Sequence, residues 1–350
     1  MQTLHAPVSL LISLLIISLL GAGLAGCGND EPTANSADSS ASSDTTSDSA
    51  ASDGGSTTPA ITALFKSGRL LGSAEVDCTL DNGDKTTCYQ LKFAANPVPY
   101  GPFCPATVND VGGLGVYDGK TNPGFQVMKK SLFEAMEADG YDVIDDKGNI
   151  RGQDPGDMSQ KPEAGKGYCL TATFDDKLEL TFLIPKKPRD LTAVNEIGTV
   201  ELFGVSLDGV PMNGDPPSVV SGMGPGGAIP ALDPCGGHPD PSGYYHWHFV
   251  AESMNLVLAA YKITEVTCTN VTQAPSALVG IAKDGYPVYG PHGADGKVPS
   301  DLDSCGGHKA VTAAYPGGVY HYHALETEAP NMPGCVKGAS VDKAFSYASK

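Results

Sequence analysis

The tetrapeptide Tyr-His-aromatic-His occurs twice in this chain, and this repetition constrains the fold more than any other feature. Residues 245–248 read Tyr-His-Trp-His, and residues 320–323, 75 positions later, read Tyr-His-Tyr-His. Successive side chains of an extended strand point to opposite faces, so the two histidines of each copy share a face. They lie about 7 Å apart along the strand and can lean together onto one metal ion. Each copy is therefore predicted to be a strand with a chelating face.

Two further blocks repeat in the same order around these tetrapeptides. Residues 204–214 match residues 280–290 at an offset of 76, and residues 233–238 (Asp-Pro-Cys-Gly-Gly-His) match residues 303–308 at an offset of 70. Three blocks in the same order at nearly the same spacing indicate an internal duplication, with units of about residues 200–268 and 278–335. Each unit is predicted to be a strand that enters an Asp-Gly-x-Pro turn, a Gly-rich loop with Cys and His, and a strand with the histidine pair.

Six histidines occupy equivalent positions in the two units. They are His238, His246 and His248 in the first unit and His308, His321 and His323 in the second. Three neutral imidazoles suit zinc or copper, and Asp208, Asp284 or Asp303 is expected to orient an imidazole. The alternative is that the histidines only form hydrogen bonds with loop carbonyls and tyrosine hydroxyls. His292 has no counterpart in the first unit and is predicted to be structural. The sequence leaves open whether the two clusters form one site or two.

Eight of the nine cysteines are predicted to form four disulfides, because an even set in an exported chain favours full pairing. A predicted turn at residues 81–84 favours the first pair, and pairing within each repeat unit is the chosen connectivity for the last four cysteines. The predicted pairs are Cys78 with Cys88, Cys104 with Cys169, Cys235 with Cys268, and Cys305 with Cys335. The last two pairs would each hold a Gly-Gly-His loop beside a histidine strand.

Residues 1–27 are predicted to be a lipoprotein signal peptide. Residues 8–20 are mostly Leu, Ile and Ser, and residues 24–27 (Leu-Ala-Gly-Cys) resemble the lipobox of bacterial lipoproteins. The resemblance implies cleavage before Cys27, acylation of that residue and a membrane partner through the lipid anchor. Gly28 resembles the signal that sorts lipoproteins to the outer membrane, so a place in the bacterial cell envelope, facing the periplasm or the exterior, is expected. An uncleaved anchor is the alternative.

Composition separates the next segment and excludes one class of partner. Residues 28–59 are rich in Ser, Thr, Ala, Asp and Gly, contain no aromatic residue, and are predicted to be a disordered tether. The formal net charge of −18 argues against nucleic acid as a partner, because such binding needs a basic surface.

The rest of the chain is predicted to be mainly β, with some short helices. In the N-terminal region, residues 60–190, β-rich runs at 87–93, 168–174 and 178–184 predict strands, and residues 128–139 predict an amphipathic helix. This α+β region is either a separate layer or an extension of the C-terminal sheet. In residues 191–350 the two β units are predicted to pack about a pseudo-twofold axis, with residues 254–261 as a short helix or a strand.

Residues 278–291, 302–308 and 319–324 together resemble the YHYH domain family, which is named for the tetrapeptide. The resemblance covers about residues 178–325 and identifies the domain in residues 191–350. Trp247 replaces the second tyrosine in the first copy, a departure that keeps both histidines. The resemblance implies the identity of the domain and no particular reaction.

Three classes of function remain. The first is a lipid-anchored extracytoplasmic protein that binds copper or zinc through the duplicated histidines. The second is a zinc-dependent hydrolase of the cell envelope, because residues 242–250 resemble the His-x-His-Phe segment of lysostaphin-type peptidases, with Asp208, Asp284 and Glu252 as candidate bases. That family's companion His and Asp motif is missing, and so is His-Glu-x-x-His. The third is a structural or carbohydrate-binding surface module without metal.

Overall fold

The structure, a computed structural model, describes residues 60–220 and 227–349. This part of the chain is rich in strands, with two short α-helices, α1 (Lys130–Ala138) and α2 (Met254–Ala260), so the mainly β prediction is confirmed. The described residues form one compact unit. No helix in the described part is long and apolar enough to cross a membrane. The predicted signal peptide, Cys27 and the predicted tether, residues 28–59, lie outside the described residues.

An eight-stranded sheet carries the duplicated units. Its order is β12-β13-β10-β9-β14-β15-β17-β16, so the first four positions mirror the last four. The strands are β9 (Leu202–Ser206), β10 (Pro211–Asn213), β12 (Gly237–Pro239), β13 (Tyr245–Trp247), β14 (Leu278–Ala282), β15 (Pro287–Tyr289), β16 (Gly307–Ala310) and β17 (Val319–His323). The two units meet where β9 pairs antiparallel with β14.

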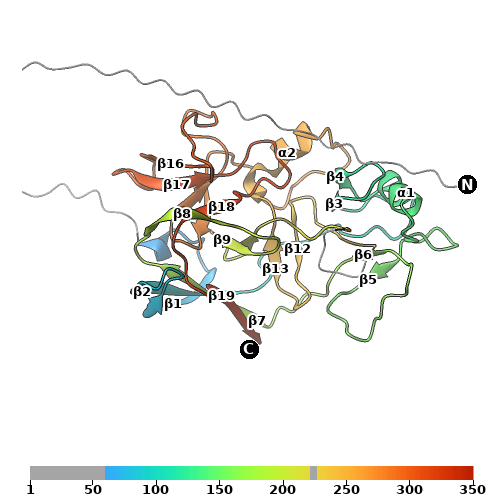
Figure 1. Cartoon of the computed structure of the whole chain (residues 1–350), viewed down its shortest axis with the longest axis horizontal. Coiled ribbons are helices and arrows are strands. Elements are labelled where there is room, and N and C mark those ends of the chain that lie inside the picture. The colour runs from blue at the N-terminus through green and yellow to red at the C-terminus, as the bar shows by residue number, and fades with distance from the viewer. Residues whose placement is uncertain (1–59, 221–226, 350) are drawn as a thin grey trace, which may run out of the picture. The chain divides into compact units, whose positions relative to one another are not determined.

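The register at that junction shows the predicted pseudo-twofold axis. Val205 of β9 pairs with Ile281 of β14, its own equivalent at the repeat offset of 76. Outward from this pair the two halves use the same connections. The strand with the histidine pair runs parallel to the strand after the Asp-Gly turn, and antiparallel to the strand of the Gly-Gly-His loop. Because these outer strands end the order on each side, β12 and β13 lie far from β16 and β17 (Figure 1).

Four smaller sheets surround the large one. They are β1 (Leu70–Thr79), β2 (Lys85–Ala94), β7 (Leu178–Pro185) and β19 (Phe345–Ser349); β11 (Ala228–Pro230), β6 (Tyr168–Leu170) and β5 (Gly152–Gln153); β18 (Cys335–Gly338) with β8 (Asp190–Glu196); and β3 (Leu114–Tyr117) with β4 (Gly124–Val127). Three of these four sheets pair a strand that begins before residue 191 with one that lies after it, so the N-terminal region is built into the rest of the unit.

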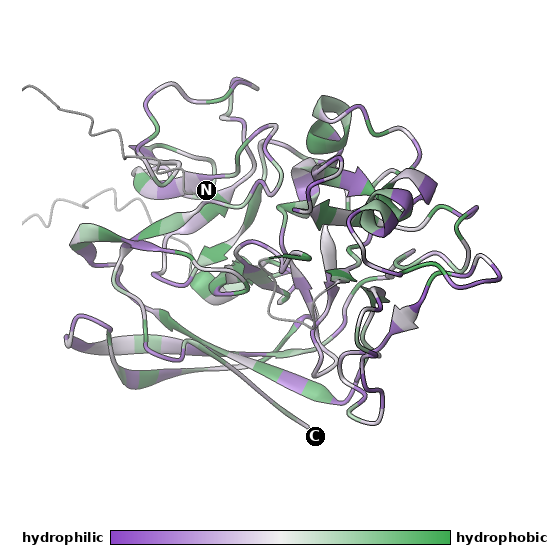
Figure 2. Cartoon of the chain, turned by 45° about the vertical axis from the view of Figure 1, so that its right-hand side comes forward, coloured by the Kyte–Doolittle hydropathy of each residue, from purple (hydrophilic) through white to green (hydrophobic). Residues whose placement is uncertain are grey.

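Local sequence accounts for most of these elements. The runs at 87–93 and 178–184 lie in β2 and β7, whereas only the first three residues of 168–174 form a strand, β6. In β7 alternate residues are buried, and green and purple segments alternate along the long strands in Figure 2. Helix α1 buries Leu132, Phe133 and Met136 on one face, and Gly140 follows it with φ +91°. Residues 254–260 form α2, which resolves the ambiguity in favour of a helix.

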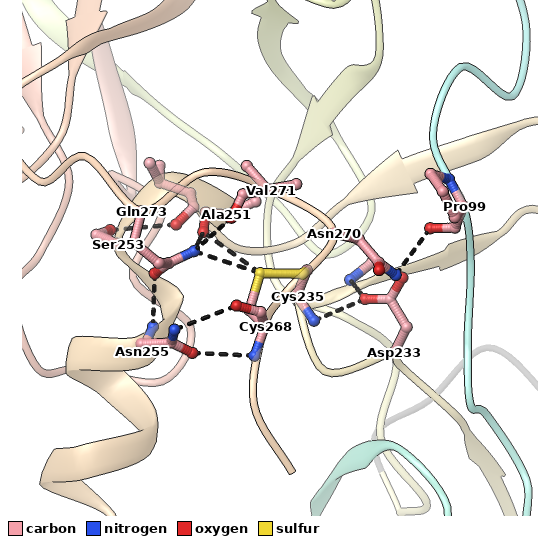
Figure 3. The surroundings of a disulfide bond; sticks show 12 residues. Pro99, Asp233, Cys235, Ala251, Ser253, Asn255, Cys268, Asn270, Val271 and Gln273 are labelled. Carbon is pink, nitrogen blue, oxygen red and sulfur yellow. Dashed lines mark hydrogen bonds between the residues drawn. A yellow bond between two sulfur atoms is a disulfide. The ribbon is translucent and has the colours of Figure 1, made fainter.

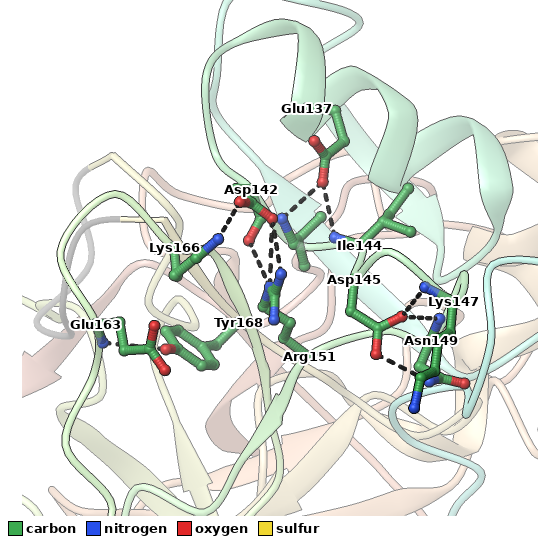
Figure 4. Close-up of polar contacts among 11 residues, drawn as sticks. Glu137, Asp142, Ile144, Asp145, Lys147, Asn149, Arg151, Glu163, Lys166 and Tyr168 are labelled. Carbon is green, nitrogen blue, oxygen red and sulfur yellow. Dashed lines mark hydrogen bonds and ion pairs between the residues drawn. The ribbon is translucent and has the colours of Figure 1, made fainter.

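Charged and polar contacts hold α1 to the loops beside it (Figure 4). Glu137 of α1 accepts hydrogen bonds from the backbone N–H groups of Val143 and Ile144, each 2.7 Å long. Asp142 pairs with Arg151 at 3.1 Å and also with Lys166. Since Asp142 precedes β5 and Lys166 precedes β6, these contacts fix the helical layer against the three-stranded sheet.

The core of the large sheet joins both units. Its apolar cluster includes the aromatic face of each tetrapeptide, opposite the histidines. Tyr245 and Trp247 pack edge to face with ring centroids 4.7 Å apart, and Phe203 of β9 packs edge to face on Tyr322 of β17 at 5.7 Å. Tyr245 and Tyr322 are both fully buried. The aromatic residues of the motif therefore fasten the histidine strands to the core.

Candidate metal centres

The Asp-x-Cys-Gly-Gly-His loop has the same hydrogen bonds in both units. Asp233 accepts the backbone N–H of Cys235 at 2.8 Å and the hydroxyl of Tyr245 at 2.7 Å. In the second unit, Asp303 accepts the N–H of Cys305 at 3.0 Å and the hydroxyl of Tyr320 at 2.8 Å. Burial raises the pKa of Asp233 to about 6, and the hydrogen bonds act in the opposite direction. The first tyrosine of each tetrapeptide thus anchors the loop that supplies the third histidine.

The two glycines of each loop have separate tasks. The first, Gly236 or Gly306, has a φ of +88° or +71°, a conformation that side chains rarely adopt. The second leaves room for the anchoring tyrosine, because a Cβ on Gly237 would lie 2.3 Å from the Tyr245 hydroxyl and one on Gly307 2.1 Å from that of Tyr320. The Gly-Gly pair therefore lets the loop turn and close over the tyrosine.

Disulfides hold these loops to the next segment of the same unit, and all four pairs predicted from the sequence are formed. Cys235 is joined to Cys268, whose backbone is held by the side chain of Asn255 in α2 (Figure 3). Gln273 donates to the carbonyl oxygen of Ala251 at 2.8 Å and so closes the same region. Cys305 is joined to Cys335 in the second unit. Each bridge closes a loop of 33 or 30 residues and contributes about 3 to 4 kcal/mol by chain entropy.

The last histidine of each tetrapeptide is fixed by the third repeated block. Nδ1 of His248 is hydrogen-bonded to the carbonyl oxygen of Gly214, and Nδ1 of His323 to that of Gly290, the latter at 2.8 Å. These two glycines end the equivalent segments 204–214 and 280–290. All three repeated blocks therefore meet at a histidine triad in each unit.

In the first triad, the Nε2 atoms converge in a buried site. Nε2 of His248 lies 3.1 Å from Nε2 of His238 and 3.0 Å from Nε2 of His246. All three side chains are buried, and His248 has no exposed surface. The backbone carbonyl of Tyr244 acts to raise the pKa of His246, against the effect of burial. It does not have the geometry of a hydrogen bond to Nδ1 of His246, so that buried atom has no partner.

In the second triad, every Nδ1 atom is paired with an oxygen. Nδ1 of His308 pairs with Asp301 at 2.8 Å and Nδ1 of His321 with the Val319 carbonyl at 3.0 Å, as His323 does with Gly290. An acceptor oxygen at Nδ1 places the proton of a neutral imidazole there and leaves a lone pair on Nε2. Three Nε2 lone pairs therefore converge: those of His308 and His321 are 3.2 Å apart, and Nε2 of His323 is buried without a hydrogen-bond partner.

Burial also keeps most of these imidazoles neutral. It lowers the pKa of His238 and His246 well below the usual value, lowers that of His248 and His323 to about 4, and lowers that of His321. Neutral imidazole is the form that binds metal, and nitrogens 2.0–2.1 Å from a tetrahedral ion are about 3.3 Å apart. The observed Nε2 separations of 3.0–3.2 Å are close to that spacing. Either triad could hold a metal ion.

The triads are two sites, which answers the question that the sequence left open. The first triad lies on β12, on β13 and at His248, the residue directly after β13. The second triad lies on β16 and β17, at the opposite end of the sheet order. Each set of three ligand atoms lies within 4.8 Å, and the two sets share no residue.

The expected role of three aspartates was wrong. None of them hydrogen-bonds an imidazole in the described part of the chain: Asp303 holds Tyr320, as shown above, Asp208 pairs with Lys66 at 2.6 Å, and Asp284 accepts the Tyr322 hydroxyl at 2.5 Å. Asp208 is the equivalent of Asp284 in the first unit, where Trp247 replaces Tyr322. Trp247 has no hydroxyl to donate, and Asp208 pairs with Lys66. The carboxylate that does orient an imidazole is Asp301, seven residues before His308.

The residues proposed as bases do not meet the triads. The pocket beside each triad is lined by other residues, without Asp208, Asp284 or Glu252. Burial raises the pKa of Glu252 to about 7, but Glu252 belongs to neither histidine cluster.

The two pockets differ in chemistry. A pocket of 660 Å³ is lined by all three histidines of the second triad and by polar residues including Tyr289, Lys297 and Thr312. His292 also lines it, and Nε2 of His292 pairs with Glu326 at 2.7 Å. A pocket of 390 Å³ beside the first triad includes His238 and His246, and its wall is mostly proline and aliphatic side chains.

Comparison with known proteins gives one match. No curated protein and no solved structure matches the chain significantly. The sequence model of the family described as YHYH protein matches residues 181–298. The match is shorter than the resemblance noted from the sequence: it includes the first triad, with its Trp-containing tetrapeptide, and ends before the histidines of the second. Residues 181–298, which carry the first triad and the junction of the duplicated sheet, therefore match the YHYH protein family.

Proposed function

We propose that this protein binds two transition-metal ions, one in each histidine triad. The observation that carries the proposal is the proton arrangement of the second triad. Asp301, Val319 and Gly290 each hold an Nδ1 proton, so the lone pairs of three Nε2 atoms face one another. Such an arrangement is repulsive without a cation between the nitrogens, and a metal ion turns it into three bonds.

Copper or zinc is the metal that this donor set favours. Each triad offers three imidazole nitrogens and no thiolate, because the eight cysteines of the described residues are all in disulfides. Imidazole suits both metals, and divalent copper binds nitrogen sites more tightly than zinc does. Three ligands leave a fourth position of a tetrahedral ion open.

The site is further proposed to act in the bacterial cell envelope. The lipobox-like residues 24–27, the tether-like composition of residues 28–59 and the full pairing of eight cysteines all support an exported, lipid-anchored chain. In that setting the triads would bind metal outside the cytoplasm, for sequestration or as reactive centres.

The other two classes have less support. A hydrolase needs a base beside the metal, and the three candidates from the sequence do not line either pocket. A purely structural or carbohydrate-binding module would satisfy its buried imidazoles with hydrogen bonds, yet Nε2 of His323, which faces the other two histidines of its triad, is buried without a partner.

Metal titration of the full chain in detergent tests the proposal. We expect two equivalents of copper or zinc per chain, one equivalent after His238→Ala, and one after His308→Ala, because these residues hold equivalent positions in the two triads. His292→Ala is the matched control, since His292 lies outside both triads, and it should keep two equivalents. Fewer than one equivalent bound to the parent chain, measured by elemental mass spectrometry, would contradict the proposal.

A further inference from the structure

The two triads are equivalent in their ligands and different in their surroundings. The pseudo-twofold axis relates His308, His321 and His323 to the first triad, but it does not relate the walls of the two pockets. All three histidines of the second triad line the 660 Å³ pocket, whereas His248 of the first triad does not line the 390 Å³ pocket. An ion in the second triad would therefore face a larger space that external molecules can enter.

The polar groups of the larger pocket favour an acceptor with negative charge. Thr312 Oγ1 accepts hydrogen bonds from the Tyr289 hydroxyl at 2.7 Å and from the Tyr315 backbone N–H at 3.2 Å. A hydroxyl that accepts two bonds has its own proton left to donate. Lys297 adds an ammonium group to the same wall, and no Lys or Arg lines the smaller pocket among the described residues.

The charge of the bound ion points to the same class of ligand. Three neutral imidazoles add no negative charge to a divalent cation, and the Asp301 carboxylate lies behind His308, at its Nδ1 atom. The other carboxylate that lines the pocket is Asp295. It accepts a hydrogen bond of 3.1 Å from the backbone N–H of Lys297, two residues later, within the same turn. The open position of the ion is therefore best filled by an anion.

We propose that the metal ion of the second triad takes a small oxyanion of the carboxylate class as its fourth ligand, with Lys297 and Thr312 holding the rest of that ligand in the pocket. This inference rests on the proposed metal binding. The first triad, with its apolar wall, keeps its ion without such a ligand. The duplication has thus produced one centre beside a smaller, mostly apolar pocket and one beside a larger pocket with polar and charged groups.

Azide and acetate are suitable probes for the full chain loaded with two equivalents of copper. Azide bound directly to divalent copper gives a charge-transfer absorption band, and acetate should displace it. We expect one azide per chain, with the band retained in His238→Ala and lost in His308→Ala. Lys297→Gln should weaken the binding of azide and of acetate about threefold, as expected for one exposed charge. Lys309→Gln is the matched control, because Lys309 lies on β16 and does not line the pocket.

The outcomes separate the two proposals. If the chain binds no copper, the metal proposal itself fails. If it binds two ions and azide gives no band, or the band persists in His308→Ala, the oxyanion site is wrong while metal binding stands. Equal weakening by Lys297→Gln and Lys309→Gln would also overturn the site, because it would reflect general surface charge. The lysine pair carries the test if His308→Ala does not fold.

Discussion

Binding of a metal ion in both triads is expected to raise the unfolding temperature by roughly 15 °C or more, compared with the same chain after a chelator has removed its metal. A ligand at about 1,000 times its Kd stabilises the folded state by about 4 kcal/mol, and 1 kcal/mol shifts the midpoint by about 2–4 °C in a domain of about 150–250 residues. The unfolded chain competes weakly, because its eight paired cysteines offer no thiolate. Differential scanning calorimetry with the disulfides intact measures the shift.

Variants make this thermal result specific. His238→Ala/His308→Ala should unfold at the same temperature with and without metal, and each single variant should show about half of the shift. His292→Ala should respond like the parent, because it leaves both triads complete. An undiminished shift in the double variant would mean that the stabilising metal binds elsewhere.

The first triad is expected to keep its metal affinity, within about threefold, between pH 7 and pH 5.5. Burial lowers the pKa of His238 and His246 well below the usual value and that of His248 to about 4, so the binding-competent neutral forms persist until the pH falls below 5. Three exposed histidines of ordinary pKa 6.5 would each be about 90 % protonated at pH 5.5, which lowers affinity about 1,000-fold.

A matched peptide isolates the effect of burial. Residues 236–248 as a free peptide carry the same three histidines without the fold, and their affinity should fall steeply over the same pH range. The measurement is competition against a chelator at each pH, with the His308→Ala chain so that only the first triad binds. Parallel pH profiles for chain and peptide would show that the fold does not protect the histidines from protonation.

The strands and turns of the two repeated units could be predicted because the short sequence patterns within each repeated block determine its local structure. The Asp-Gly turns, the Gly-Gly loops and the alternating tetrapeptides specify strands and turns within a few residues, and the cysteine order follows the duplication. The pairing of Val205 with Ile281, which joins the units, needed the structure, because strand order depends on packing of residues far apart in sequence.

The polar environment of the triads was less predictable. The sequence indicated that aspartates matter, but Asp303 and Asp284 bind tyrosine hydroxyls rather than imidazoles. Asp284 also accepts the N–H of Gly338, 54 residues away, a contact that no local pattern encodes. The position of Asp301 beside His308 depends on a loop with no counterpart at that point in the first unit, where Ala231 stands at the repeat offset of 70.

The most direct test of the central claim is anomalous diffraction from crystals of the metal-loaded chain, measured on both sides of the absorption edge of the metal. We predict two peaks per chain, each about 2.0–2.1 Å from three Nε2 atoms. One peak should lie among His238, His246 and His248 and the other among His308, His321 and His323. Peaks at other residues, or triads without a peak in crystals that contain two equivalents of metal, would contradict the account.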